Sequence, residues 1–511
     1  MMFSNWQVSR CREVRSSQPL ISARSLGSGS PKINPPAHSR CAGNIHLYNL
    51  ECAVTGITPS PNDGDPAIVW NIFRYPMTST PAPTSHSSSE RITPAGWRVV
   101  LLASLGGTLE FYDFVIFGVF ARDIAAAIFP SASPIASLMA SFATFAVGYF
   151  ARPFGGIILS HYGDRYGRRQ VFLWSVFVMS AATLGMGLVP SHASWGVWAS
   201  FLMVTLRLLQ GFCLGGELPG ALTYVVETAP RIAPLVCGVV FSCVTMGVAA
   251  ATAVSLSLRT FLDPALVPVY GWRIAFVIGG LGGVLSFVLR RSLEESPEFE
   301  RMKRLASRQP FGDLLRTHKT QVLVGGALLA GTGCFNGLFF SHMPAYLTGV
   351  LHYDPRQAVF SQTVGVIASA LGILLTGWLG DRIPPRHLLR LGVTLLLVLS
   401  YPFYLALEAR SVDLTLLLVL AGLAAGLTNG SFAVLLTDLF PTRIRFTGVA
   451  LGFNISFTLF SGTAPLVATS LIGGTGQMAS PAFLMMACAL IALAGSWWVE
   501  RYGGNVLRTQ S

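Results

Sequence analysis

Hydrophobic residues in this chain are gathered into long runs that short polar stretches separate. From Trp97 onward the runs recur at about 20 residues each, the length that an α-helix needs to cross a membrane. This pattern predicts an all-α membrane protein with twelve transmembrane helices. The predicted spans are 97–120, 136–159, 170–190, 194–218, 234–258, 271–290, 320–343, 358–379, 387–407, 413–436, 447–470 and 478–499.

Residues 1–93 lack this pattern and are rich in Ser, Pro, Arg and Asn. Their longest apolar run, "AIVWNIF" at 67–73, is too short to cross a membrane. We expect a disordered segment. The favoured hypothesis is that translation starts at Met77 and that 1–76 is an over-long gene prediction. The alternative is a targeting extension, because the stretch is Arg- and Ser-rich and poor in acids.

Composition supports the membrane assignment. The chain is 52% hydrophobic and 11% charged, with a net charge of +12, whereas soluble domains are about 25% charged. Most basic residues lie in the short gaps between apolar runs, which is atypical of a nucleic-acid-binding face. None of the eight cysteines forms a CxxC pair, so neither a metal site nor a disulfide framework is expected, and no cofactor is expected.

The loops define an orientation and a division of the chain. Lys and Arg are concentrated in the loops after the even-numbered spans, which predicts that these loops and both termini are cytoplasmic. The largest loop, 291–319, separates two predicted six-helix bundles at 94–290 and 320–500, and a short cytoplasmic tail follows at 501–511. The predicted location is the cell (inner) membrane.

Two loop sequences repeat between the halves and carry a resemblance to a known family. "SHYGDRYGRR" at 160–169 and "GWLGDRIPPR" at 377–386 each follow the second span of their half. Both resemble the G-x-x-x-D-R-x-G-R-R loop motif of the major facilitator superfamily. The first copy has Ser160 in place of the first glycine, and the second has Pro384 and Pro385 where Gly-Arg is usual.

Further stretches resemble one branch of that family, the metabolite:proton symporters. They include "GGTLEFYDFVIFG", "RLLQGFCLGGELPGA" and "LFPTRIRFTGVALGFNISF". The resemblance implies two rocking six-helix bundles, a functional monomer in the lipid bilayer, and a small-molecule substrate carried with protons. Known members of the group move citrate, 2-oxoglutarate, other carboxylates, shikimate, or proline and betaine. The osmosensing members carry a C-terminal coiled coil, and the sequence after residue 500 contains no heptads.

Glu110 and Asp113 are two carboxylates inside the first span, on one helix face. Each costs roughly 2.5–3.5 kcal/mol on insertion scales, so such residues rarely face lipid. Hydrocarbon favours the neutral acid and a nearby arginine favours the ionised one, so the pair can load and release a proton. The prediction is proton coupling by Asp113 and Glu110. The alternative is a structural ion pair.

Substrate binding is predicted for buried polar residues at similar depth. Arg207, at the centre of the fourth span, can grip a carboxylate with two hydrogen bonds, unless it forms a permanent bridge to one of the two acids. Arg152 is a second anion clamp or a gate residue. Polar side chains that could add hydrogen bonds, or equally serve helix packing, are Tyr149, Gln210, Asn336 and Asn429.

Charged residues in the loops are predicted to control conformation, because contacts that form in only one state bias the equilibrium between states. These are Asp164, Arg165, Gly167, Arg168, Arg169, Glu217, Asp381, Arg382, Asp438, Arg443 and Arg445.

An enzyme is not expected, because the chain has no GxSxG, HExxH or P-loop sequence. The predicted function is proton-coupled symport of a small organic acid of the di- or tricarboxylate type. The alternatives are proton-coupled uptake of a zwitterion such as proline or betaine, and carboxylate exchange. A membrane sensor that does not transport is disfavoured.

Overall fold

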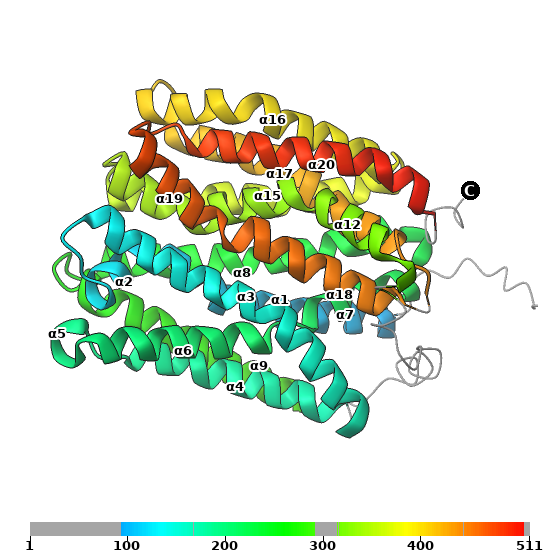
Figure 1. The fold of residues 1–511 in the computed structure, drawn as a ribbon, viewed down its shortest axis with the longest axis horizontal. Coiled ribbons are helices and arrows are strands. Elements are labelled where there is room, and N and C mark those ends of the chain that lie inside the picture. Colours follow the sequence, from blue (N-terminus) through cyan, green and yellow to red (C-terminus); the bar gives the residue numbers. More distant parts are fainter. Residues whose placement is uncertain (1–93, 167, 292–313, 315, 443, 505–511) are drawn as a thin grey trace, which may run out of the picture. The chain divides into compact units, whose positions relative to one another are not determined.

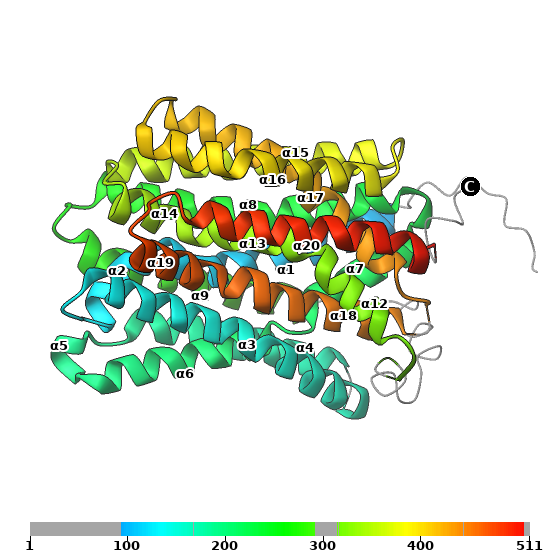
Figure 2. The same cartoon turned by 45° about the horizontal axis from the view of Figure 1, so that its top comes forward.

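The computed structural model describes residues 94–166, 168–291, 314, 316–442 and 444–504. The predicted disordered segment, nearly all of the central loop and most of the tail lie outside these residues. Within them the chain is helical and contains no strand, and the long helices run side by side along a common axis (Figures 1 and 2).

Every predicted span of the N-terminal half contains helix. The long helices are α1 (Pro94–Val119), α3 (Pro134–Tyr166), α4 (Arg168–Leu188), α6 (Val197–Cys213), α7 (Glu217–Thr228), α8 (Ala233–Phe261) and α9 (Trp272–Arg291). The short helices α2 (Ala121–Ile128) and α5 (His192–Trp195) lie between them. The predicted run 194–218 therefore covers the end of α5, all of α6 and the start of α7.

In the C-terminal half, segments that are not regular α-helix interrupt the predicted spans, and the sequence pattern does not predict them. Its helical elements are α12 (Lys319–Leu328), α13 (Ala330–Phe335), η3 (Asn336–His342), α14 (Met343–Ala345), η4 (Tyr346–Val350), α15 (Pro355–Gly380), α16 (Pro385–Ala409), α17 (Leu414–Asp438), α18 (Arg445–Ser456), η5 (Phe457–Gly462), α19 (Ala464–Thr475) and α20 (Pro481–Tyr502). The segments η3, η4 and η5 are π-helical. Such segments are frequent at functional sites.

By length and composition, nine helices of the described residues can cross a membrane, or ten if the bent pair Lys319–Leu328 and Ala330–Val350 is one span. That pair is bent by 43°. The run 387–407, interrupted in sequence by Arg390 and Pro402, is one continuous helix, α16. Arg390 is accommodated because its Nη2 pairs with Glu500 on α20 at 3.0 Å.

Glycines allow α3 and α6 to approach closely beside the predicted site. A Cβ atom on Gly155 would lie 1.7 Å from the Phe212 carbonyl oxygen, and one on Gly211 would lie 1.9 Å from the Gly148 oxygen. Small residues commonly mediate such contacts between membrane helices. This close contact fixes α3 against the helix that carries Arg207.

Gly155→Ala is therefore expected to destabilise the protein by about 1–3 kcal/mol, because the added methyl group forces the two helices apart. The measurement is the thermal-unfolding midpoint of the purified protein in detergent. Gly216→Ala is the matched control, since no atom lies within 4 Å of a Cβ there. Equal midpoints for the two variants would contradict the packing argument.

The two halves touch along α8 and α15, where a Cβ on Gly238 would lie 2.9 Å from the Gly377 Cα. They also touch where α1 meets η3, with a Cβ on Gly118 lying 2.7 Å from the Ser341 Cβ. We call the end of the bundle that carries the start of α18 the predicted inner end, and the end that carries α2 the predicted outer end (Figure 1).

Candidate functional site

Arg207 lies within α6 and is fully buried. Its Nη2 donates to the Phe114 carbonyl on α1 at 2.9 Å, and its Nη1 donates to the Gln210 Oε1. Its Nε has no hydrogen-bond partner among the described residues. Both partners are neutral, so among the described side chains Arg207 forms no ion pair with Asp113. A guanidinium has five N–H donors, and these two bonds leave donors for a ligand.

Aromatic rings enclose Arg207. Its Cζ lies 3.9 Å from the Phe114 ring centroid, 4.8 Å from that of Phe117 and 5.0 Å from that of Phe145. Ring faces stabilise a desolvated cation by about 2 kcal/mol but do not neutralise it. Sequence reasoning missed these rings, although phenylalanines at 111, 114 and 117 follow a helical spacing.

Arg152 faces the same ring. It lies on α3, is 2% exposed, and its Cζ is 5.0 Å from the Phe114 centroid. The Phe111 and Tyr149 rings lie at 5.9 and 5.1 Å. Its Nε and Nη1 have no hydrogen-bond partner among the described residues. Two buried guanidinium groups from different helices thus converge on Phe114.

Asp113 occupies a niche inside the N-terminal half. It is 1% exposed, and neither carboxyl oxygen has a hydrogen-bond partner in the part of the chain that the structure describes. A Cβ on Gly279 of α9 would lie 2.4 Å from Oδ1, and one on Gly283 would lie 3.4 Å from Oδ2. These glycines provide the space that the carboxyl group fills. Glu110, also buried at 4% exposure, lies one turn earlier on α1.

Gln210 connects Arg207 to the surroundings of Asp113. Its Oε1 accepts from Arg207, and its Nε2 donates to the Thr183 hydroxyl at 2.9 Å and to the Asp113 backbone carbonyl at 3.2 Å. Thr183, on α4, was not identified from the sequence, where it is one of many threonines in apolar runs. The Gln210 amide is thus committed to protein partners in this structure.

Tyr149 joins the two halves. Its hydroxyl lies 3.2 Å from the Ser461 hydroxyl on η5, and its backbone carbonyl accepts from Thr458 at 2.8 Å. Nearby, the Asn454 Nδ2 donates to the Gly215 carbonyl at 2.6 Å. These bonds link η5 and α18 of the C-terminal half to α3 and to the segment between α6 and α7.

The two predicted asparagines differ in their hydrogen bonding. Asn429 is buried in α17, and its Nδ2 donates to Ala425 in the same helix at 3.2 Å. Asn336, at the start of η3, is 9% exposed, and its Oδ1 has no hydrogen-bond partner in the described part of the chain. Asn336 therefore has an unused acceptor, whereas Asn429 has a bond within its own helix.

The predicted inner end is held by charged contacts between the halves. The Arg445 Nη1 lies 2.8 Å from the Glu227 Oε1, joining the start of α18 to the end of α7. The Asp381 carboxylate lies at the Leu235 amide in the first turn of α8, where an anion is favourable. Asp438 accepts the Gly504 amide at 2.7 Å, a contact within the C-terminal half. Glu227 was missed in the sequence, although it is an acid at the end of an apolar run.

The other residues predicted to control conformation are described only in part. The Arg382 Cζ lies 3.8 Å from the Trp378 ring centroid. The side chains of Asp164, Arg165, Arg168, Arg169 and Glu217, together with Gly167 and Arg443, lie outside the described structure. Their conformational role stays a prediction.

Glu227→Gln should weaken the contact with Arg445 and increase the population that is open at the predicted inner end. We expect a rise of about fivefold, which corresponds to ~1 kcal/mol. The measurement is the distance distribution between spin labels at the exposed Arg231 and Arg501, in a protein whose cysteines are replaced by serine. Exchanging the two charges in a Glu227→Arg, Arg445→Glu variant should restore the closed distance.

Glu408→Gln, an exposed acid on α16 near the other end, is the control and should leave the distribution unchanged. A Glu227→Gln distribution identical to that of the control would show that the ion pair does not hold this end closed.

The predicted outer end carries its own contacts between the halves. The Arg122 Nη1 donates to the Thr348 carbonyl at 3.0 Å, and the Arg356 Nε donates to the Arg259 carbonyl at 2.9 Å. The Arg259 side chain pairs with Asp123 at 2.8 Å. Burial raises the pKa of Asp123, and the Arg259 charge opposes that rise. Both ends are thus bridged, and the residues between them are buried.

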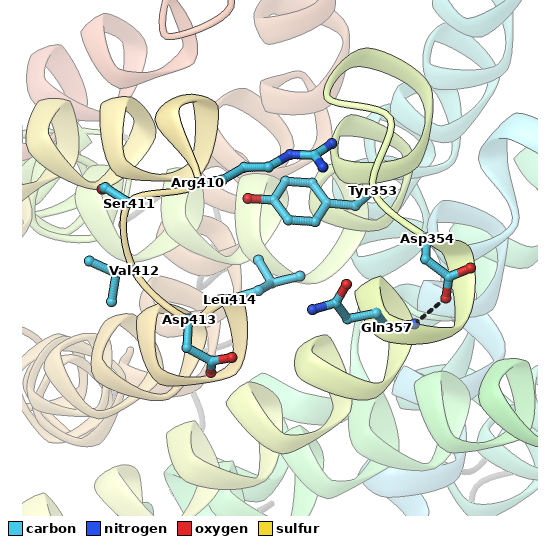
Figure 3. A pocket seen from close by; sticks show the side chains of 8 residues that line it. All are labelled: Tyr353, Asp354, Gln357, Arg410, Ser411, Val412, Asp413 and Leu414. Atoms are coloured by element: carbon cyan, nitrogen blue, oxygen red, sulfur yellow. Dashed lines mark hydrogen bonds between the residues drawn. The ribbon is translucent and has the colours of Figure 1, made fainter.

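A hollow of about 490 Å³ at the predicted outer end is lined by Tyr353, Asp354, Gln357, Arg410, Ser411, Val412, Asp413 and Leu414 (Figure 3). Its charged groups already have partners. Asp354 and Asp413 each accept a backbone amide at the start of a helix, α15 and α17. The Arg410 Nη2 donates to the Leu351 and His352 carbonyls. The Arg410 bonds connect the loop after α16 to the loop before α15. Because the charged groups have protein partners, we assign no ligand to the hollow.

Comparison with known proteins identifies the family. The model of the Major Facilitator Superfamily matches residues 103–453. The chain is 32% identical to a citrate-proton symporter of Klebsiella pneumoniae over 82% of this chain and 95% of that protein. It is 31% identical to a proline/betaine transporter of Escherichia coli strain K12 over 78% of this chain and 82% of that protein.

A solved structure of the proton:xylose symporter XylE, bound to 6-bromo-6-deoxy-D-glucose, shares the fold. The TM-score is 0.65 at 14% identity, covering 81% of this chain and 98% of that one. The likeness in fold agrees with the predicted twelve-helix architecture, and the named bacterial relatives are transporters rather than enzymes. The chain belongs to the major facilitator superfamily of multi-pass membrane transporters.

Proposed function

We propose that this protein is a secondary active transporter that carries a small organic acid together with protons. The observation that carries the proposal is the buried Arg207: within the described structure its hydrogen-bond partners are neutral, and its Nε has no partner. A buried charge without a counter-ion is unfavourable. A carboxylate substrate would supply the counter-charge and use the unoccupied donors. Arg152, facing the same phenylalanine ring, is the proposed second anion contact.

Asp113 is the proposed proton carrier, with Glu110 contributing. The Asp113 carboxyl group is enclosed by glycines, without an ion pair to Arg207 among the described residues. Such a group is most readily buried in its neutral form. A proton bound at Asp113 cancels one negative charge of an anion bound at Arg207, so the loaded site carries one negative charge fewer than it would with the anion alone. That balance favours joint movement of proton and anion through the membrane.

The similarity to the citrate-proton symporter of Klebsiella pneumoniae supports a carboxylate substrate and proton coupling. The similarity to the proline/betaine transporter of Escherichia coli supports the second candidate, a zwitterion, because its carboxylate could bind Arg207 in the same way. A carboxylate exchanger would use the same site without a proton.

The proposed cycle is alternating access, with bundles 94–290 and 320–500 rocking about the site. Contacts at both ends and buried site residues support an occluded intermediate. The Arg445–Glu227 pair and Asp381 are proposed contacts of the inner gate. We place the protein in the inner membrane as a functional monomer, with both termini in the cytoplasm, on the charge distribution of its loops.

The substrate class is tested by counterflow in proteoliposomes that contain the full chain. Liposomes are loaded with unlabelled citrate, 2-oxoglutarate, succinate, shikimate, an aromatic acid, proline or betaine, and uptake of the same labelled compound is followed. Counterflow of one or more carboxylates, and none of proline or betaine, supports the proposal. Counterflow restricted to proline or betaine would contradict the proposed carboxylate substrate and would favour a zwitterion.

A further inference from the structure

We infer that Thr183, acting with Gln210, couples the proton on Asp113 to the anion on Arg207. This inference rests on the proposed function, because it assumes that Asp113 carries a proton and that Arg207 binds an anion. It assigns to Thr183 a positioning role, in which the hydroxyl acts through Gln210 rather than by touching the substrate.

Hydrogen bonds connect Arg207 to Gln210 and Gln210 to Thr183, which lies beside Asp113. Arg207 donates to the Gln210 Oε1, and the Gln210 Nε2 donates to the Thr183 Oγ1 at 2.9 Å. Thr183 donates to the Met179 carbonyl at 3.0 Å, and its hydroxyl lies beside the Asp113 carboxyl group. The side chains that form these contacts are all buried, so bulk water does not compete for the hydrogen bonds.

Gln210 and Arg207 also bind the backbone of α1, at Asp113 and Phe114. Gln210 donates to the Asp113 carbonyl at 3.2 Å, and Arg207 donates to the next carbonyl, that of Phe114, at 2.9 Å. A movement of Gln210 therefore moves Arg207 relative to α1. The amide of Gln210 cannot turn without breaking bonds at both of its ends.

A hydroxyl has one hydrogen to donate and two lone pairs to accept with. When Asp113 is ionised, the Thr183 hydrogen can turn from Met179 to the carboxylate, which strengthens Thr183 as an acceptor for Gln210. When Asp113 is protonated, the acid donates to Thr183, and the threonine returns its hydrogen to Met179. The proton thus changes how firmly Gln210 holds Arg207, and protonation releases Arg207 for the anion.

The other charged and titratable groups around Asp113 sit on identified elements. Glu110 and Tyr112 lie on α1 itself, and the Tyr112 hydroxyl donates to the Ala275 carbonyl at 3.1 Å. Arg152 lies on α3. At this level α4 contributes the neutral Ser180 and Thr183, and α9 contributes Gly279 and Gly283. Thr183 is the hydroxyl that lies beside the Asp113 carboxyl group and also accepts from the amide that holds Arg207.

The test compares two readouts in proteoliposomes containing the full chain, with radiolabelled citrate as the probe. One is citrate–citrate exchange without a gradient, and the other is citrate accumulation driven by an imposed pH gradient. Thr183→Val removes the hydroxyl at nearly constant volume. We expect its accumulation to fall about tenfold, within the 5–150-fold range of typical site–site coupling, while its exchange falls less than about threefold. Thr183→Ser should restore accumulation.

Thr363→Val on α15 is the matched control, because Thr363 is buried and donates only the same kind of bond within its helix, to Val359 at 2.8 Å. Thr183→Ala replaces Thr183→Val if the valine variant does not fold. Accumulation and exchange that stay equal to those of the wild type, or that fall together, would overturn the inference. A wild-type protein that shows no gradient-driven accumulation of any carboxylate would instead overturn the proposed function, and the inference with it.

Discussion

Asp113→Asn is expected to abolish proton-driven accumulation of the substrate while leaving exchange across the membrane. Asparagine has nearly the same shape, so it fits the niche formed by Gly279 and Gly283. It cannot bind or release a proton, and it imitates the neutral acid. A pH difference of ~2 units supplies about 2.7 kcal/mol per proton, or roughly 100-fold accumulation with one proton per substrate. The variant should accumulate none beyond equilibration.

The measurement is uptake of labelled substrate with and without an imposed pH gradient. Asp263→Asn, an exposed acid between α8 and α9, is the control and should accumulate substrate like the wild type. Glu110→Gln reports whether the second acid shares the proton. Gradient-driven accumulation by Asp113→Asn at the wild-type level would remove Asp113 from the coupling mechanism.

Arg207→Lys is expected to weaken substrate binding by about 100-fold or more, although the positive charge is kept. Truncating one partner of a buried, hydrogen-bonded charge pair costs about 2–5 kcal/mol. An ammonium has three donors on a compact head, and it cannot hold Gln210, hold the Phe114 carbonyl and present a planar pair of donors to a carboxylate. The ring contacts of the guanidinium with Phe114, at 3.9 Å, would be lost as well.

Binding is measured by titration of the purified protein with the compound found in the counterflow panel. Arg390→Lys is the matched control, because Arg390 is a helix arginine paired with Glu500, on α16 and away from the site. It should bind substrate as the wild type does. Unchanged affinity in Arg207→Lys would show that the anion binds elsewhere.

The sequence predicted the helices well, because a membrane imposes a minimum length on every apolar run. It failed at the interruptions. The segments η3 and η5 have π-helical rather than α-helical hydrogen bonding, beside the contacts between the halves. A run of apolar residues looks the same in sequence whether its helix is α or π, so the pattern could not predict these segments. The same applies to the break between α6 and α7.

For the site, the sequence could single out charged residues that are costly in hydrocarbon, which is why Asp113 and Arg207 were found. It left open whether they form a permanent bridge, since side-chain partners depend on helix rotation. The structure instead places Gln210 and Thr183 between them. Neutral partners such as Thr183 carry no insertion penalty that would mark them, and so they were missed.

The most direct test of the account is proton movement itself. Proteoliposomes containing the full chain and a trapped pH-sensitive dye, with no pH gradient imposed, would receive external citrate, 2-oxoglutarate or succinate, and in parallel betaine. The account predicts internal acidification with at least one carboxylate, no acidification with betaine, and none with any carboxylate in Asp113→Asn. If the wild-type protein transports a carboxylate into the liposomes without acidifying their interior, that result would contradict proton-coupled transport.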